Sequence, residues 1–145
     1  ILELSQDIGH RLFTFNKKAT GVAISVRDNE LFTKQWQCKI PLSTQSPSVI
    51  AREAFSLFEK NYSWKHPIRS ITVRAINLVS LDFDEQINLF YDAEKNSRIE
   101  ALDKAVEEIR SRYGYNAIKN AMLLQNPKMP SHNSPKLIMP TGVPQ

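Results

Sequence analysis

The stretch GVAISVR, residues 21–27, alternates branched apolar side chains with small or polar ones. Successive side chains of a strand point to opposite faces, so this alternation predicts a strand with one buried face and one polar face. The buried face holds Val22, Ile24 and Val26, and the polar face holds Ala23, Ser25 and Arg27.

Two further strands are predicted around this one. Residues 28–30 suit a hairpin turn, and a return strand over 31–40 follows, in which Lys34 breaks the alternation and indicates a bulge or a strand end. The inward positions of that strand are Phe32, Trp36, Cys38 and Ile40. A third strand over 68–78, opened by Pro67, carries Ile71 and Val73 on one face and Ser70, Thr72 and Arg74 on the other.

Two amphipathic helices are predicted to cover the apolar face. The helix over 3–16 has a stripe at helical spacing, weakened by Gly9, and is followed by a turn over 17–21. After a connection over 41–47, Ser46 is the expected N-cap of a helix over 47–62, with Pro47 in the first turn. The apolar stripes are Leu4, Ile8, Leu12 and Phe15, and then Ile50, Ala54, Leu57, Phe58 and Tyr62. The expected fold is an α+β two-layer sandwich with an antiparallel-rich sheet.

The rest of the chain divides into shorter segments. A helix over 96–114 is predicted, with Ser97 and Glu100 as a capping box, and a short helix over 116–124. Residues 125–145 contain five prolines and no helical period, so a tail is expected. The expected organisation is a domain over 1–80, a linker over 81–95, a helical segment over 96–124 and this tail. The apolar stripe of the longer helix is Ile99, Leu102, Val106, Ile109 and Tyr113.

Composition narrows the classes of function. The 145 residues carry a net charge of +4, and no apolar run approaches the roughly 20 residues that span a bilayer, so no membrane partner is expected. The single cysteine, Cys38, suits the cytoplasm. No catalytic constellation, metal-ligand spacing or cofactor motif is present, so no catalytic site is expected in this chain. Because the chain begins at Ile1 and not at Met, a fragment or processed piece of a longer protein is expected.

Basic charge is concentrated on the predicted sheet domain. Residues 17–74 carry ten Lys and Arg against four Asp and Glu, whereas 75–95 has a net charge of −4. Basic and small residues on the polar strand face suit a phosphate backbone held without sequence readout. The candidate DNA contacts are Ser25, Arg27, Lys39, Ser70, Thr72 and Arg74. An RNA-binding sheet module and a protein-interaction adaptor are the alternatives, although the predicted face lacks aromatic residues for base stacking.

The pentapeptide QINLF, residues 86–90, lies within the acidic stretch. Adjacent Leu89 and Phe90 fit neither a helical nor a strand period, so they are interpreted in two ways. They either tuck under their own domain or enter a partner's pocket while Gln86 hydrogen-bonds at its rim.

The order of these motifs is similar to the little finger domain of Y-family translesion DNA polymerases of the ImpB/MucB/SamB, UmuC- and DinB-like group. The resemblance rests on GVAISVR at 21–27, KIP at 39–41, PIRSITVR at 67–74 and QINLF at 86–90. The segment LDKAVEEIRSRYG, residues 102–114, resembles the part beyond the clamp motif in the UmuC-like branch.

The resemblance implies a role in DNA damage bypass within the SOS response. The polar strand face would lie in the major groove of template-primer duplex, and Gln86, Ile87, Leu89 and Phe90 would bind the β sliding clamp. The palm and its Mg²⁺-binding carboxylates would belong to another part of a parent DNA polymerase. Family domains begin with a strand that is missing before residue 3, so we expect another segment or a second copy, as in a crystal dimer, to cover the open sheet edge.

Overall fold

The computed structural model describes residues 1–82 and 93–124. One compact unit spans Ile1–Glu107, and a second begins at Glu108. In the first unit the chain forms, in order, α1 (Leu2–Thr14), β1 (Lys17–Asp28), β2 (Thr33–Thr44), α2 (Pro47–Asn61), β3 (Ile68–Ser80) and most of α3 (Ala93–Tyr113).

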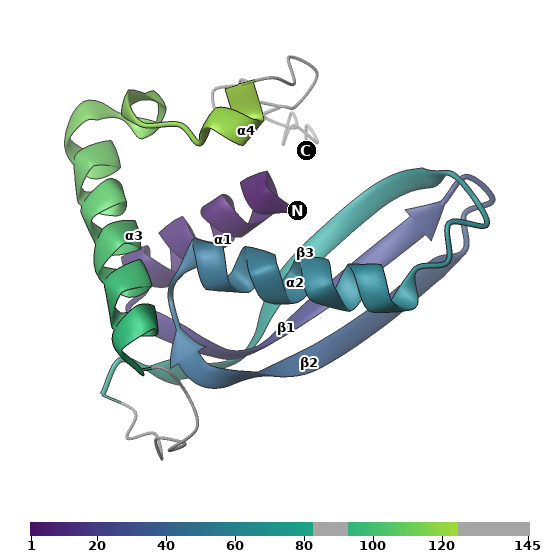
Figure 1. Cartoon of the computed structure of the whole chain (residues 1–145), viewed down its shortest axis with the longest axis horizontal. Helices are drawn as coiled ribbons and strands as arrows, with labels where there is room; N and C mark the ends of the chain where they lie inside the picture. Colours follow the sequence, from purple (N-terminus) through teal and green to yellow (C-terminus); the bar gives the residue numbers. More distant parts are fainter. Residues whose placement is uncertain (83–92, 125–145) are drawn as a thin grey trace, which may run out of the picture. The chain divides into compact units, whose positions relative to one another are not determined.

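The three strands form one antiparallel sheet in the order β2-β1-β3. Helices α1 and α2 pack on each other and along one face of this sheet, and the other face carries no helix of the pair (Figure 1). The predicted α+β sandwich is confirmed.

The core forms where the apolar face of β1 meets the two helices. Ile24 lies opposite Trp36 of β2 and Val73 of β3, so the alternation predicted for all three strands converges on one side. Each Val, Leu, Ile or Phe side chain contributes about 1.5–3 kcal/mol when it is fully buried. The buried apolar side chains on this side are Leu12, Ala19, Val22, Ile24, Val26, Ile40, Val49, Ile50, Ala54, Phe58 and Val73, whereas Ala23 is buried on the opposite face of β1.

Both long strands extend further than predicted. The turn expected over 17–21 is wrong, because the chain turns earlier, at Phe15 and Asn16 (φ 51° at Asn16), and Lys17 already pairs with Ser80 of β3. The connection expected over 41–47 is shorter, because Thr44 still pairs with Ala19 across a register shift in β1–β2. Strand pairing extends both elements where local sequence indicated loops.

Phe32 does not face the core as predicted, since its side chain is 68% exposed. It closes the hairpin instead: its N–H donates to the Asp28 carboxylate at 3.0 Å, and its carbonyl accepts from the Asp28 N–H at 3.1 Å. Strand β2 therefore begins at Thr33, and Lys34 is its second residue. Of the two explanations predicted for Lys34, a bulge or a strand end, the strand end applies.

Helix α2 begins as predicted. The Ser46 hydroxyl accepts a hydrogen bond from the Val49 N–H at 3.2 Å, and Pro47 occupies the first turn. Gly9 of α1 lies against this proline, where a Cβ would fall 2.8 Å from Pro47 Cδ. The glycine that weakens α1 locally thus allows the two helices to approach closely.

Helix α3 departs from prediction in its start and its orientation. It begins at Ala93, so Ser97 and Glu100 do not form an N-terminal capping box. Glu100 instead accepts from the Thr44 hydroxyl at 2.7 Å. Further along α3, the Asp103 carboxylate contacts the Ser46 hydroxyl, and the Glu107 carboxylate contacts the His10 ring. Acidic side chains therefore face the sheet domain, whereas Leu102 of the predicted apolar stripe is 64% exposed and only Ile99 packs on the core.

The second unit holds the end of α3 and two short elements. Arg110 is buried, donates from Nε and an Nη atom to the Ile118 carbonyl at 3.1 and 2.9 Å, and lies over the Tyr115 ring. The helix predicted over 116–124 is a 3₁₀ turn, Tyr115–Ala117, followed by α4, Ala121–Leu124.

Candidate nucleic-acid interface

The face of the sheet that α1 and α2 leave uncovered, here called the open face, is a regular grid of side chains. Strand β1 lies in the middle, and four of its residues each have one partner on β2 and one on β3. Read from β2 to β3, the rows are Lys39–Gly21–Ile76, Gln37–Ala23–Arg74, Gln35–Ser25–Thr72 and Thr33–Arg27–Ser70.

The register brings all six predicted DNA-contact residues onto this face. Ser25 lies directly opposite Thr72, Arg27 opposite Ser70, and Arg74 opposite Ala23. Lys39 lies opposite Gly21, on the other edge of the sheet from Arg74. Of the six predicted contacts, Ser25 is half-buried and the other five are exposed.

The open face is basic without opposing charge. Its twelve residues include three cations, no Asp or Glu, and no aromatic side chain. Thr33, Gln35 and Gln37 also lie on the open face, although they are not among the predicted contacts. Their pairing with the central strand was the missing signal, because it sets Gln35 beside Ser25.

At the Gly21 end of the open face, the neighbouring atoms leave no room for a side chain on β1. A Cβ on Gly21 would lie 2.9 Å from Ile76 Cγ1 and 3.0 Å from the Cys38 carbonyl oxygen, so only glycine fits there. Strand β1 pairs on both sides, so its amides serve the sheet ladders. The side chains of β1, and not its amides, are therefore what this strand offers to a partner on the open face.

The hairpin at the other end positions Arg27. The Asp28 carboxylate accepts from the N–H groups of Glu30 and Phe32, both at 3.0 Å, and the Arg27 Nε donates to the Leu31 carbonyl at 3.4 Å. These bonds order the turn beside the guanidinium, which remains exposed.

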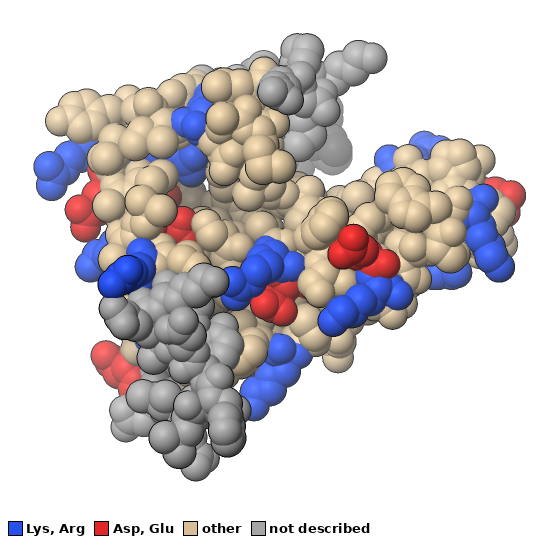
Figure 2. Space-filling view, in the orientation of Figure 1, with Lys and Arg blue, Asp and Glu red and all other residues tan. Residues whose placement is uncertain are grey.

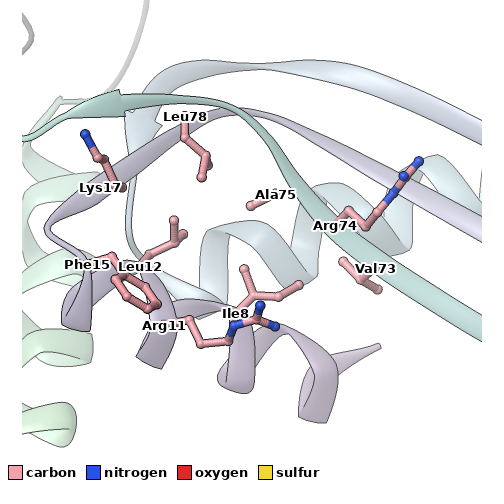
Figure 3. A pocket seen from close by; sticks show the side chains of 9 residues that line it. All are labelled: Ile8, Arg11, Leu12, Phe15, Lys17, Val73, Arg74, Ala75 and Leu78. Carbon is pink, nitrogen blue, oxygen red and sulfur yellow. The ribbon is translucent and has the colours of Figure 1, made fainter.

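A hollow of about 500 Å³ lies between α1 and the edge strand β3 (Figure 3). Ile8, Leu12 and Leu78 line it, and Arg74 of the open face points away from it. Phe15, predicted to be buried with the α1 stripe, is 69% exposed at its mouth. The hollow adjoins β3, one of the two edge strands of the sheet. That another segment or a second copy covers an open sheet edge stays a prediction.

Other site chemistry is sparse in the described residues. Within residues 1–82 and 93–124, no three His, Cys, Asp or Glu side chains are grouped to hold a metal ion, and no helix is long and apolar enough to cross a membrane. Burial raises the pKa of the Cys38 thiol, with a smaller contribution from the Glu53 carboxylate. The predicted clamp-binding residues 86–90 lie outside the described residues.

The fold and the open face define a small α+β domain that presents a basic, polar sheet surface backed by two helices. Residues 1–89 match the model of the impB/mucB/samB family C-terminal domain. The chain belongs to this family, which confirms the resemblance inferred from its motifs.

Curated relatives agree with this assignment. The chain is 37% identical over 126 residues to a DNA polymerase IV of Acetivibrio thermocellus, covering 87% of this chain and 32% of that protein. It is 30% identical over 125 residues to a DNA polymerase IV of Clostridium acetobutylicum, covering 86% and 31%. The chain therefore spans about a third of the length of these relatives.

Proposed function

We propose that this domain grips duplex DNA for a translesion DNA polymerase and tethers that polymerase to a sliding clamp. The observation that carries the DNA-binding part is the open face, where three cations and a row of hydroxyl and amide side chains face solvent without an acidic residue. Membership of a family with relatives named DNA polymerase IV supports DNA as the partner.

The dimensions of the open face suit a DNA groove. Neighbouring strands lie about 4.8 Å apart, so the outer strands of a three-stranded sheet are separated by roughly 10 Å. The major groove is about 12 Å wide. Lys39 and Arg74 stand on opposite outer strands, one row apart. From there they would reach phosphates on both walls of the groove, while Ser25 and Thr72 face its floor.

Such binding depends on phosphates and not on base identity. Neutralising each phosphate contact contributes about 0.9 to the slope of log K against log salt concentration. We expect Lys39→Gln and Arg74→Gln each to weaken binding of a template-primer duplex and to reduce that slope by about 0.9. Fluorescence anisotropy over a salt series on several DNA sequences measures both quantities.

A matched control removes a cation from helix α1, which packs on the covered face of the sheet. Arg11 of α1 is exposed and pairs with Asp7, with Nη1 and Oδ2 3.7 Å apart. Arg11→Gln changes the net charge by the same amount and is expected to leave the slope unchanged. Equal losses from all three substitutions would mean that net charge, and not the open face, drives binding.

The tethering part of the proposal rests on the peptide QINLF, 86–90, and its family resemblance. Leu89 and Phe90 would fill an apolar pocket of the β sliding clamp, Gln86 would hydrogen-bond at the rim, and Ile87 would lie alongside. An anchor pair of this kind is worth roughly 2–4 kcal/mol. Leu89→Ala/Phe90→Ala is therefore expected to weaken clamp binding at least about thirtyfold in surface plasmon resonance.

The clamp experiment separates the two parts of the proposal. The double variant should bind duplex DNA normally, because the open face is unchanged. Undiminished clamp binding by this variant would refute tethering while leaving the DNA-binding proposal intact. We assign polymerisation itself, with Mg²⁺ as its metal, to the parent enzyme. We further propose that the chain acts in the cytoplasm and in SOS damage bypass.

A further inference from the structure

Four aromatic side chains contact one another at the C-terminal end of α2 and in the loop before β3. The rings of Phe58 and Tyr62 stack with centroids 5.2 Å apart, and Trp64 meets them edge-on at 5.6 and 5.4 Å. Phe55 lies 6.5 Å from Phe58. We call Phe55, Phe58, Tyr62 and Trp64 the aromatic platform.

The inner members of the aromatic platform are anchored. Phe58 is buried with Ile24 and Val26 of the sheet core, and Tyr62 packs against the same cluster. The Tyr62 hydroxyl donates to the His66 carbonyl at 2.6 Å. These contacts hold the loop and fix the base against which Trp64 rests.

The outer members are presented to solvent. Trp64 is 68% exposed and Phe55 is 53% exposed. Trp64 also has a φ of 55°, a left-handed backbone conformation that is rare for a bulky side chain. Two large rings are thus held outward on a buried aromatic base instead of being folded into the core.

Basic residues flank these rings in the sequence. Lys60 and Lys65 are exposed on either side of Tyr62 and Trp64 in the chain, and Arg69 is exposed at the start of β3. Residues 52–69 contain two acids: Glu53, which is half-buried and pairs with Arg52, and Glu59, which is exposed. Glu30 of the hairpin lies 3.5 Å from the His66 ring. Figure 2 shows Lys and Arg side chains gathered at this end of the sheet, around the β1–β2 hairpin and the start of β3.

We propose that the aromatic platform binds single-stranded DNA. Every base has a flat π face, so exposed rings flanked by lysines bind a single strand by stacking and phosphate contact without reading its sequence. Trp64 and Phe55 would stack on bases, and Lys60 and Lys65 would hold the backbone. The site lies on the helix side of the sheet and is separate from the open face; only the choice of DNA over RNA rests on the proposed function.

Intrinsic fluorescence gives a direct test, because the chain has two tryptophans. In a Trp36→Phe chain, Trp64 is the single reporter. We expect titration with oligo(dT) of about ten nucleotides to quench its emission, and added salt to reverse the quenching. Absence of quenching at concentrations that saturate anisotropy of the labelled oligonucleotide would overturn the proposal.

Substitution provides the second test. Trp64→Ala should weaken oligo(dT) binding about fivefold to 160-fold, the range for loss of one stacked base, while duplex affinity stays unchanged. Phe32→Ala is the matched control, because Phe32 is also 68% exposed and lies outside the aromatic platform. Equal losses from both variants would contradict the assignment.

A variant that keeps all four rings tests the site even if Trp64→Ala misfolds. Lys60→Gln/Lys65→Gln should lower the salt slope for oligo(dT) by about 1.4; an unchanged slope would refute the backbone contacts. Tighter binding of oligo(rU) than oligo(dT) would overturn the choice of DNA. Failure of the open-face proposal would show separately, as duplex binding that is insensitive to Lys39→Gln and Arg74→Gln.

Discussion

Gly9 of α1 lies in contact with Pro47 of α2, at a separation that leaves no room for a side chain. A Cβ at residue 9 would be 2.8–2.9 Å from three atoms of the proline ring. The ring is rigid and occupies the first turn of α2, so it cannot move aside as a flexible side chain would. The packing of α1 on α2 depends on this contact.

Gly9→Ala is predicted to destabilise the domain. Alanine gains about 1 kcal/mol of helix propensity, but overpacking a core contact costs typically 1–3 kcal/mol. A rigid proline puts Gly9 at the upper end, so a net loss of about 1–2 kcal/mol is expected in the free energy of unfolding measured by urea titration.

Ser5→Ala in the same helix should act in the opposite direction. The Ser5 hydroxyl is buried and has no hydrogen-bond partner among residues 1–82 and 93–124, and an unsatisfied buried polar group costs about 1–3 kcal/mol. Urea titration should therefore show unchanged or increased stability. Destabilisation by both substitutions would indicate that α1 tolerates no new alanine, whatever the contact.

Asp103→Ala is predicted to loosen α3 from the sheet domain. The Asp103 carboxylate accepts from the hydroxyls of Ser46 and Ser48, the latter at 2.9 Å, at the N-terminus of α2, where negative charge is favoured. Losing these bonds should cost about 1–2 kcal/mol. Amide hydrogen exchange should then become faster in α3, whereas the neighbouring Lys104→Ala should leave it unchanged.

Thr72→Glu is predicted to reduce duplex binding at least about tenfold, because it places a carboxylate opposite Ser25 at the centre of the open face. The residue is exposed, so stability should change by less than about 1 kcal/mol. Ser97→Glu on α3 carries the same charge change on an exposed site and serves as the control in anisotropy titrations. Similar losses for both would argue against the open face.

Cys38 is predicted to react slowly with iodoacetamide at neutral pH. Its pKa is raised, mainly by burial, and the thiolate is the reactive form. The rate should rise as the pH approaches and passes the raised pKa, and it should be much faster in urea, where the ordinary pKa returns. Mass spectrometry of the alkylated chain follows both rates; equal rates in the folded and unfolded states would contradict this expectation.

Local patterns were reliable where one physical cause dominated. The alternation in residues 21–27 identified both faces of β1, and Ser46 with Pro47 identified the start of α2, because period and capping act over a few residues. Strand ends were missed because pairing with a neighbour, as between Lys17 and Ser80, extends a strand through residues with turn-like local sequence.

The amino-acid sequence by itself determined the α+β class, the polar face of each strand and the family, since these depend on periodicity and on motif order. Tertiary structure alone decided which polar residues meet, because register between strands places Ser25 beside Thr72 and Gln35. It also decided that α3 turns acidic side chains inward, toward hydroxyl groups at the N-terminus of α2, and that Trp64 stands exposed on a buried aromatic base. These outcomes depend on contacts between segments far apart in the chain, which a local pattern does not encode.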